Sequence, residues 1–210
     1  RLVNWYEHGY MAVDYRVFDV GVQTAQVLRK ILLGVPVGEA AVNDEHANGN
    51  GALMRVLPLA LWHQGSDAEL VQLAYTQSHV THAHLRSKVC CALYCLWARR
   101  LVQGVDRDDA WDHAVASLRQ LYAKDEAAQN ELEWHIRPDE TYQCAGSGYV
   151  VDCLHSARLA MQQNSFEDVV KTAIALGKDT DTTACVAGGL AGIYFGVRQI
   201  PHRWLHALRG

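Results

Sequence analysis

The stretch GKDTDTTACVAGGLAGIYFG, residues 177–196, joins a short acidic cluster to a run of small and apolar residues. Three glycines destabilise an isolated helix, so this run predicts a helix that packs very closely against its neighbours. Asp179, Asp181 and Thr182 place three oxygen donors within four positions. Hard donors at this density favour Mg²⁺, Mn²⁺ or Ca²⁺ over Zn²⁺. In the alternative interpretation, these carboxylates only cap the helix at the positive end of its dipole.

The remainder of the chain has helical patterns too, and regular two-residue alternation is absent. Ser66-x-x-Glu69 is a capping box, and Pro58 predicts a kink or a restart. Residues 124–144 lack a dominant period, so a short helix and a surface loop are expected there. The sequence therefore predicts one all-α domain over residues 1–210, a compact orthogonal multi-helix bundle. The expected helices cover residues 20–33, 50–62, 66–81, 84–103, 106–123 and 165–176.

Composition describes an ordinary globular chain of 210 residues, with 50% hydrophobic and 20% charged residues. The formal net charge of −4 makes nucleic acid an unlikely partner. No apolar run is long enough to span a bilayer, so no membrane partner is expected. The six cysteines form no Cys-x-x-Cys pair, which is typical of buried thiols in a reducing cytoplasm; a zinc site or a catalytic cysteine is the less favoured alternative.

Two glycine-rich loops can bring backbone N–H groups close to a ligand. Residues 48–51 alternate asparagine with glycine, and a helix start after such a loop can hold an anion such as a pyrophosphate. Arg55 would either add positive charge to this site or stabilise the loop from behind. The alternative for the loop itself is a tight turn with an N-cap. Residues 146–149 read GSGY, and Tyr149 can stack on a sugar or an adenine or instead pack in the core.

Several segments resemble, in order, the motifs of the ADP-ribosylglycohydrolase family. Gly177–Thr182 resembles the family's C-terminal signature, and Phe18-Asp19-Val20-Gly21 resembles its F-D-[IV]-G element. Residues 48–55, NGNGALMR, and residues 146–152, GSGYVVD, resemble its two glycine-rich loops. The pair Thr81-His82 falls where the family often has Thr-His. The resemblance covers nearly the whole chain.

This resemblance implies Mg²⁺-dependent hydrolysis of the glycosidic bond between ADP-ribose and a modified protein or small molecule. The acceptor, whether arginine, serine or nucleic acid, is left open. Two Mg²⁺ ions, with Mn²⁺ as a possible substitute, would be bound in part by Asp179, Asp181 and Thr182. Asp19 is the candidate catalytic residue, with an N-cap of the following helix as its alternative. The candidate substrate-binding residues are Asn48, Gly49, Asn50, Gly51, Met54, His82, Gly146, Ser147, Gly148 and Tyr149.

The family also opens with a glutamate-bearing glycine-rich segment and a Thr-Asp-Asp signature, and neither is present here. We therefore expect residues 1–210 to form an incomplete domain whose partner is the missing N-terminal segment. That segment would carry the general acid or base, so the chain alone should be inactive. Two alternatives stay open: an ADP-ribose-binding or immunity-type protein without catalysis, and a structural relative that has lost activity.

Overall fold

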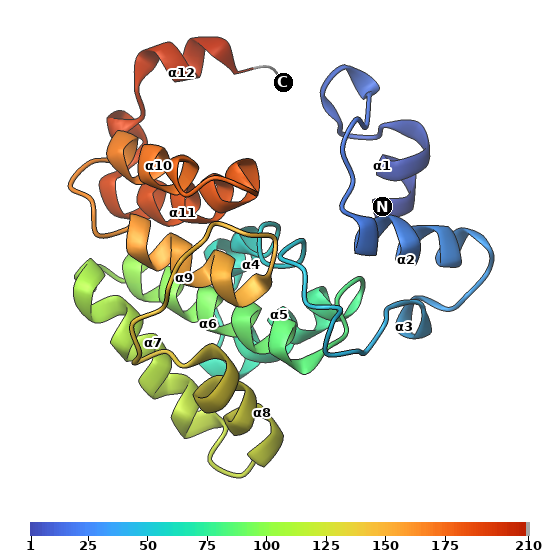
Figure 1. The fold of residues 1–210 in the computed structure, drawn as a ribbon, viewed down its shortest axis with the longest axis horizontal. Coiled ribbons are helices and arrows are strands. Elements are labelled where there is room, and N and C mark those ends of the chain that lie inside the picture. The colour runs from blue at the N-terminus through green and yellow to red at the C-terminus, as the bar shows by residue number, and fades with distance from the viewer. Residues whose placement is uncertain (209–210) are drawn as a thin grey trace.

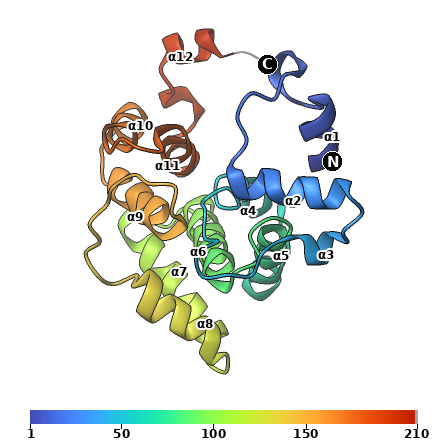
Figure 2. The same cartoon turned by 45° about the vertical axis from the view of Figure 1, so that its right-hand side comes forward.

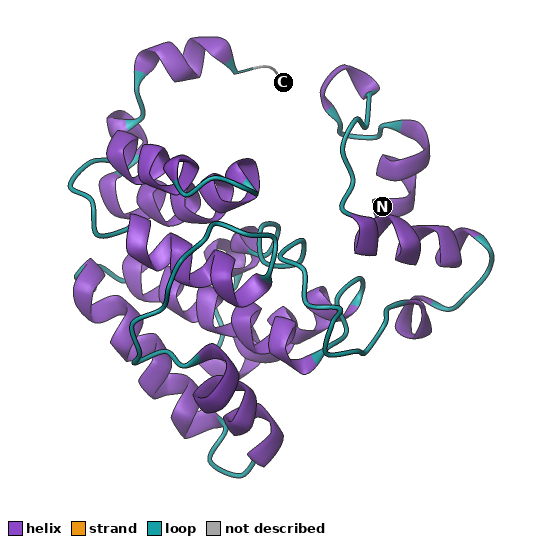
Figure 3. Cartoon of the chain, in the orientation of Figure 1, coloured by secondary structure: helices purple, strands orange, loops and turns teal. Residues whose placement is uncertain are grey.

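The structure of residues 1–208, a computed structural model, consists of helices and loops (Figures 1 and 3). No strand forms in this part of the chain, although one isolated antiparallel bridge joins Gly49 to Tyr149. The predicted all-α fold class is confirmed. In chain order the helices are α1 (Leu2–His8), η1 (Val13–Tyr15), α2 (Val22–Leu32), α3 (Val37–Ala40), α4 (Leu57–Trp62), α5 (Asp67–His79), α6 (Leu85–Val102), α7 (Arg107–Leu121), α8 (Glu126–Asn130), η2 (Glu131–Ile136), α9 (Val150–Ala160), α10 (Phe166–Ala175), α11 (Thr180–Phe195), η3 (Val197–Gln199) and α12 (His202–Ala207).

Helix α6 is the centre of the core. An unbroken run from Val89 to Arg99 is buried all around this helix, as is typical of a helix surrounded by others. Helices α4, α5, α7, α9 and α11 pack against α6 from different sides (Figure 2). The core therefore lies around one long helix, and the loops that join its neighbours gather at the ends of the bundle.

Local capping signals set several helix boundaries where they were predicted. Ser66 and Glu69 form the complete capping box of α5, and the Ser165 side chain caps α10. His84, at the N-cap of α6, accepts a hydrogen bond from the backbone N–H of Arg86.

Two expectations about local structure need correction. The expected helix over residues 50–62 begins only at Leu57, and residues 50–55 form turns. Pro58 lies in the first turn of α4, where its missing N–H breaks no hydrogen bond. Glu131–Ile136 is a π-helix rather than a surface loop. Its Leu132 and Ile136 are fully buried in the core.

Helix α11 approaches its neighbours as closely as its small residues predicted. A Cβ atom added at Gly189 would lie 2.5 Å from Leu57 Cδ2 and 3.1 Å from the Tyr94 hydroxyl. The Tyr94 hydroxyl donates to the Val186 carbonyl of α11 at 2.9 Å. Glycine therefore lets α11 pack directly against α4 and α6, and this packing fixes the position of the acidic cluster at the start of α11.

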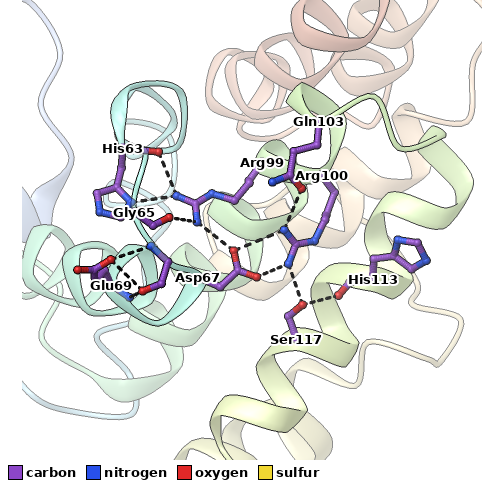
Figure 4. A network of polar contacts seen from close by, with 10 residues as sticks. His63, Gly65, Asp67, Glu69, Arg99, Arg100, Gln103, His113 and Ser117 are labelled. Atoms are coloured by element: carbon purple, nitrogen blue, oxygen red, sulfur yellow. Dashed lines mark hydrogen bonds and ion pairs between the residues drawn. The ribbon is translucent and has the colours of Figure 1, made fainter.

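A buried ionic network joins the beginning of α5 to the end of α6 (Figure 4). The Asp67 carboxylate accepts from Arg99 at 2.9 Å and is also paired with Arg100. Arg99 donates further to the carbonyls of His63 and Gly65. Burial raises the pKa of Asp67, but the hydrogen bonds and charges of the two arginines outweigh it and lower that pKa overall. The network keeps the α4–α5 turn against α6.

Helices α1 to α3 lie to one side of the bundle (Figures 1 and 2). Val27 and Leu28 bury the inner face of α2. The Gln23 side chain ties α2 to the bundle, because its Nε2 donates to the carbonyls of Ala47 and Thr81. Among residues 1–208, no helix has both the length and the apolar character that a bilayer crossing requires.

Candidate functional site

A cleft of about 820 Å³ opens where α2, the loop before α4 and the beginning of α11 meet. Its walls combine carboxylates, amides, a histidine and bare glycine backbone. A volume of this size accommodates a nucleotide-sized molecule. The lining residues are Phe18, Asp19, Gly21, Val22, Gln23, Thr24, Gln26, Val42, Asp44, His46, Ala47, Gly49, Asn50, Gly51, Met54, His82, Gly148, Asp179, Asp181 and Thr182.

The two glycine-rich loops, distant in sequence, pair with each other at this cleft. The backbone N–H of Asn50 donates to the Gly148 carbonyl at 2.9 Å, and the N–H of Val150 donates to the Asn48 carbonyl at 2.9 Å. Gly49 and Gly148 both line the cleft beside this junction. The pairing places glycine backbone from both loops on one wall.

The same junction reaches the acidic cluster. Asn50 Nδ2 donates to Asp179 Oδ2 at 2.8 Å, and the backbone N–H of Asp179 donates to the Gly146 carbonyl at 2.8 Å. Asp179 occupies the N-cap position of α11, but its side chain accepts no capping hydrogen bond. The capping interpretation is therefore wrong for this carboxylate, which is oriented toward the cleft by Asn50. Asp19 is likewise not an N-cap, because α2 is capped by Gly21.

Asp152 stabilises the second glycine-rich loop, residues 146–149, through hydrogen bonds to backbone N–H groups. Its carboxylate accepts from the backbone N–H of Ala145 at 2.8 Å and of Ser147 at 2.6 Å. Gly146 has φ +60°, and a Cβ atom there would lie 2.8 Å from the Gly177 carbonyl oxygen. Only glycine satisfies both conditions without strain. The loop is thus rigidly held against the turn that leads into α11.

Four of the predicted substrate-binding residues do not line the cleft: Asn48, Gly146, Ser147 and Tyr149. The buried Asn48 side chain is fully used within the protein, donating to Glu45 O and bonding to His84 and Ser87. The Tyr149 hydroxyl accepts from Arg86 at 3.1 Å, and Arg86 also pairs with Glu131. Burial raises the pKa of Tyr149, which the Arg86 charge partly opposes. These residues hold the loops, and the other ten predicted site residues lie in the cleft walls.

Behind the first loop, Arg55 donates to the Gly51 carbonyl at 3.1 Å, to the Gln77 carbonyl at 3.1 Å and to Thr81 Oγ1 at 2.7 Å. Thr81 Oγ1 is in turn 2.7 Å from His82 Nδ1. Burial, and then the Arg55 charge, lower the pKa of His82 to about 3. His82 therefore lines the cleft as a neutral imidazole.

Further residues line the cleft that no sequence pattern indicated: Gln23 and Thr24 of α2, and Asp44 and His46 in the loop after α3. Gln23 Nε2 bridges Ala47 and Thr81, and its Oε1 accepts from the Gly49 N–H at 3.4 Å. Nothing in the local sequence distinguishes such a glutamine on a helix from a solvated one. Its proximity to Asp19 in the chain was the only available signal.

The donor set fits a hard divalent cation. Asp179, Asp181 and Thr182 offer two carboxylates and a hydroxyl on one wall of the cleft, and Asp19 and Asp44 line the same cleft. Within residues 1–208, no group of three His, Cys, Asp or Glu side chains lies close enough together to hold a metal ion by itself. Asp179, Asp181 and Thr182 would therefore supply only part of the oxygen ligands that Mg²⁺ prefers.

The cysteines are not placed for chemistry. Cys90, Cys91, Cys95 and Cys153 are buried, and burial raises the pKa of Cys91 and of Cys153 to about 12 in each case. A thiol with such a raised pKa is protonated at neutral pH and is a poor nucleophile or metal ligand. The prediction of buried thiols is confirmed for Cys90, Cys91 and Cys95. Cys153 is buried as well, whereas Cys144 is partly exposed and Cys185 is exposed.

Comparisons with known proteins point to one family. Residues 1–210 match the sequence model of the family described as ADP-ribosylglycohydrolase. The chain is 33% identical over 205 residues to an ADP-ribosylarginine hydrolase Tri1 of Pseudomonas putida (strain GB-1), covering 97% of this chain and 53% of the relative. It is 29% identical over 211 residues to an ADP-ribosylarginine hydrolase Tri1 of Serratia proteamaculans (strain 568), covering 99% of this chain and 55% of that protein. It is 30% identical over 161 residues to the ADP-ribosyl-[dinitrogen reductase] glycohydrolase of Rhodospirillum rubrum, covering 76% of this chain and 50% of that protein.

A solved structure described as an ADP-ribosylglycohydrolase-related protein complex superposes with a TM-score of 0.71 at 28% identity. The superposition covers 98% of this chain and 65% of the solved chain. The chain spans about half the length of the curated relatives it matches. The family match over all residues, the shared fold and the paired loops beside Asp179 together show that this chain belongs to the ADP-ribosylglycohydrolase family.

Proposed function

We propose that the protein containing this chain removes ADP-ribose from a modified acceptor by hydrolysing the glycosidic bond. The observation that carries this proposal is the junction of Asn50, Gly148 and Asp179. It sets two glycine-backbone loops and an oriented carboxylate on one wall of a nucleotide-sized cleft. The names of the relatives, two ADP-ribosylarginine hydrolases and a glycohydrolase of ADP-ribosylated dinitrogen reductase, support the same reaction.

Each wall of the cleft suits one part of ADP-ribose. The exposed backbone of Gly49, Gly51 and Gly148 leaves room for close approach of a diphosphate. Asp179, Asp181 and Thr182 would hold Mg²⁺, which when bound supplies charge to orient ribose hydroxyls and polarise the scissile centre. The Asp19 carboxylate also lines the cleft and would accept hydrogen bonds from a ribose or from water.

We further propose that the cation site is completed by a segment outside residues 1–210, because this chain contributes only a partial ligand set. The acceptor is a protein or small molecule that carries ADP-ribose. Arginine is the first linkage to test, since two of the relatives are named ADP-ribosylarginine hydrolases.

The test measures release of free ADP-ribose from ADP-ribosylated arginine and serine, with Mg²⁺ and with EDTA. Residues 1–210 are assayed alone and joined to the preceding segment of the protein. We expect Mg²⁺-dependent release from the joined protein, loss of release in Asp179→Asn, and no loss in the matched control Asp109→Asn, in the first turn of α7. Binding of ADP-ribose without release from any linkage would favour a binding protein over an enzyme.

A further inference from the structure

Arg55 is a partly buried cation without a carboxylate partner among the ion pairs of residues 1–208. Its guanidinium donates hydrogen bonds to three oxygens: the carbonyls of Gly51 and Gln77 and the hydroxyl of Thr81. Burying a charge in this way is costly unless hydrogen bonds compensate for it. Each of the three oxygens acts as an acceptor toward Arg55, because a guanidinium can only donate.

The Thr81 hydroxyl connects Arg55 to His82 through hydrogen bonds. A hydroxyl can accept two hydrogen bonds and donate one. Arg55 Nη2 can only donate, so at 2.7 Å it occupies an acceptor position of Thr81 Oγ1. The hydroxyl hydrogen then has one acceptor within reach in the described chain, His82 Nδ1 at 2.7 Å.

The opposite arrangement is unfavourable. If His82 Nδ1 carried the hydrogen and donated to Thr81, both neighbours of the hydroxyl would be donors. The hydroxyl hydrogen would then have no acceptor, and Thr81 is 0% exposed. An unsatisfied buried donor costs more than the hydrogen bond gains. The network therefore selects the imidazole tautomer whose hydrogen is on Nε2.

His82 Nε2 faces the ligand-binding side. It has no hydrogen-bond partner within residues 1–208, and His82 lines the cleft. Cβ atoms added at Gly49 or Gly51 would each touch Nε2 at 3.4 Å, and the one at Gly51 would lie 3.1 Å from Cε1, so the two glycines leave this edge of the imidazole uncovered. Because burial and the Arg55 charge keep the ring neutral, Nε2 presents a single N–H.

We propose that Arg55 is a positioning residue: acting through Thr81, it fixes His82 in the Nε2–H tautomer, so that the first loop presents a hydrogen-bond donor to an oxygen of the bound ADP-ribose. The identity of the ligand rests on the proposed function, whereas the tautomer does not. A ligand hydroxyl could accept from a protonated Nε2 or donate to an unprotonated one, so it would not require a particular tautomer. The ligand oxygen is therefore one that can only accept, such as a phosphate oxygen.

The first test reads the tautomer in the ligand-free protein. Long-range ¹H–¹⁵N correlation spectra of histidine-labelled protein distinguish protonated from unprotonated ring nitrogens, and the His82→Gln spectrum assigns the His82 signals among the 11 histidines. We expect hydrogen on Nε2 in the wild type and in Thr81→Ser, and a mixture of tautomers in Arg55→Gln. Hydrogen on Nδ1 in the wild type, or an unchanged signal in Arg55→Gln, would overturn the proposal.

The second test is a double-mutant cycle on ADP-ribose affinity. Arg55→Gln and Thr81→Val should each weaken binding in proportion to the fraction of His82 that leaves the Nε2–H tautomer, about twofold for an even mixture. A glutamine at position 82 donates an N–H without tautomers, so adding Arg55→Gln to His82→Gln should cause little further loss. An equal loss in both backgrounds would show that Arg55 only supports the loop and would refute the relay.

Thr76→Val is the matched control for Thr81→Val, since Thr76 is exposed on α5 and its hydroxyl bonds only to the Gln72 carbonyl. It should leave both tautomer and affinity unchanged. If Arg55→Gln fails to fold, Thr81→Ser against Thr81→Val provides the same comparison. Absence of ADP-ribose binding in the wild type, with the tautomer as expected, would count against the proposed function and not against the relay.

Discussion

Replacing Gly189 by alanine tests whether the close contacts of α11 position the acidic cluster. The new Cβ would lie 2.5 Å from Leu57 Cδ2 and 3.1 Å from the Tyr94 hydroxyl, so both side chains must move. Overpacking of this kind costs about 1–3 kcal/mol. Alanine also favours a helix over glycine by about 1 kcal/mol, and this gain offsets part of the loss.

Gly192→Ala is the matched control that isolates the packing cost, because it gives α11 the same increase in helix propensity as Gly189→Ala. A Cβ there would have its nearest neighbour, Phe166 Cε2, at 4.0 Å, which is an ordinary contact. Gly189→Ala should therefore be less stable than Gly192→Ala by about 1–3 kcal/mol. Urea unfolding with matched slopes measures this difference. Two variants equal within about 0.5 kcal/mol would refute the close packing.

Three further predictions concern the cleft. Asn50→Ala removes the donor that orients Asp179, so titration calorimetry with Mn²⁺ on the complete protein should show about 10- to 100-fold weaker binding; equal affinity would contradict that role. Asp152→Asn replaces one of the two oxygens that accept backbone N–H groups by an NH2 donor and should destabilise the protein by about 1.5–3 kcal/mol in urea unfolding, whereas Asp109→Asn should change little. Burial lowers the folded-state pKa of His82 to about 3, so between about pH 6.5 and 3 the unfolded chain binds one more proton than the folded chain. The free energy of unfolding therefore decreases as the pH is lowered through this range. His82→Gln should flatten that slope by up to about 1.4 kcal/mol per pH unit, and an unchanged slope would refute the buried neutral state.

The sequence predicted the fold well wherever a local signal sets the structure. The capping box at Ser66 and Glu69 depends only on neighbouring residues, and so does the restart at Pro58. The extra helical turns expected after Asn50 do not form because Gly51 and the pairing with Gly148 hold residues 50–55 in turns. The π-helix at Glu131–Ile136 depends on burial of Leu132 and Ile136 against the core, which no period in the sequence records.

The site shows the same division between local and long-range information. The small residues of α11 and the acidic cluster were visible in sequence, and Asp179, Asp181 and Thr182 do line one cleft. The sequence could not separate residues that face the cleft from residues that hold its loops. Asn48 is occupied by Ser87, and Tyr149 by Arg86, through contacts that span 39 and 63 positions. Only the folded arrangement decides which way such side chains turn.

A crystal structure of the protein with ADP-ribose and Mg²⁺ would show directly whether this cleft binds the substrate and the cation. We expect the diphosphate against the backbone of Gly49, Gly51 and Gly148, the ribose beside Asp179, and the cation bound to oxygens of Asp179, Asp181 and Thr182 at about 2.0–2.1 Å. His82 Nε2 should lie within hydrogen-bond distance of a ligand oxygen. A ligand bound outside this cleft, or a cation that none of these three residues contacts, would refute the proposed site.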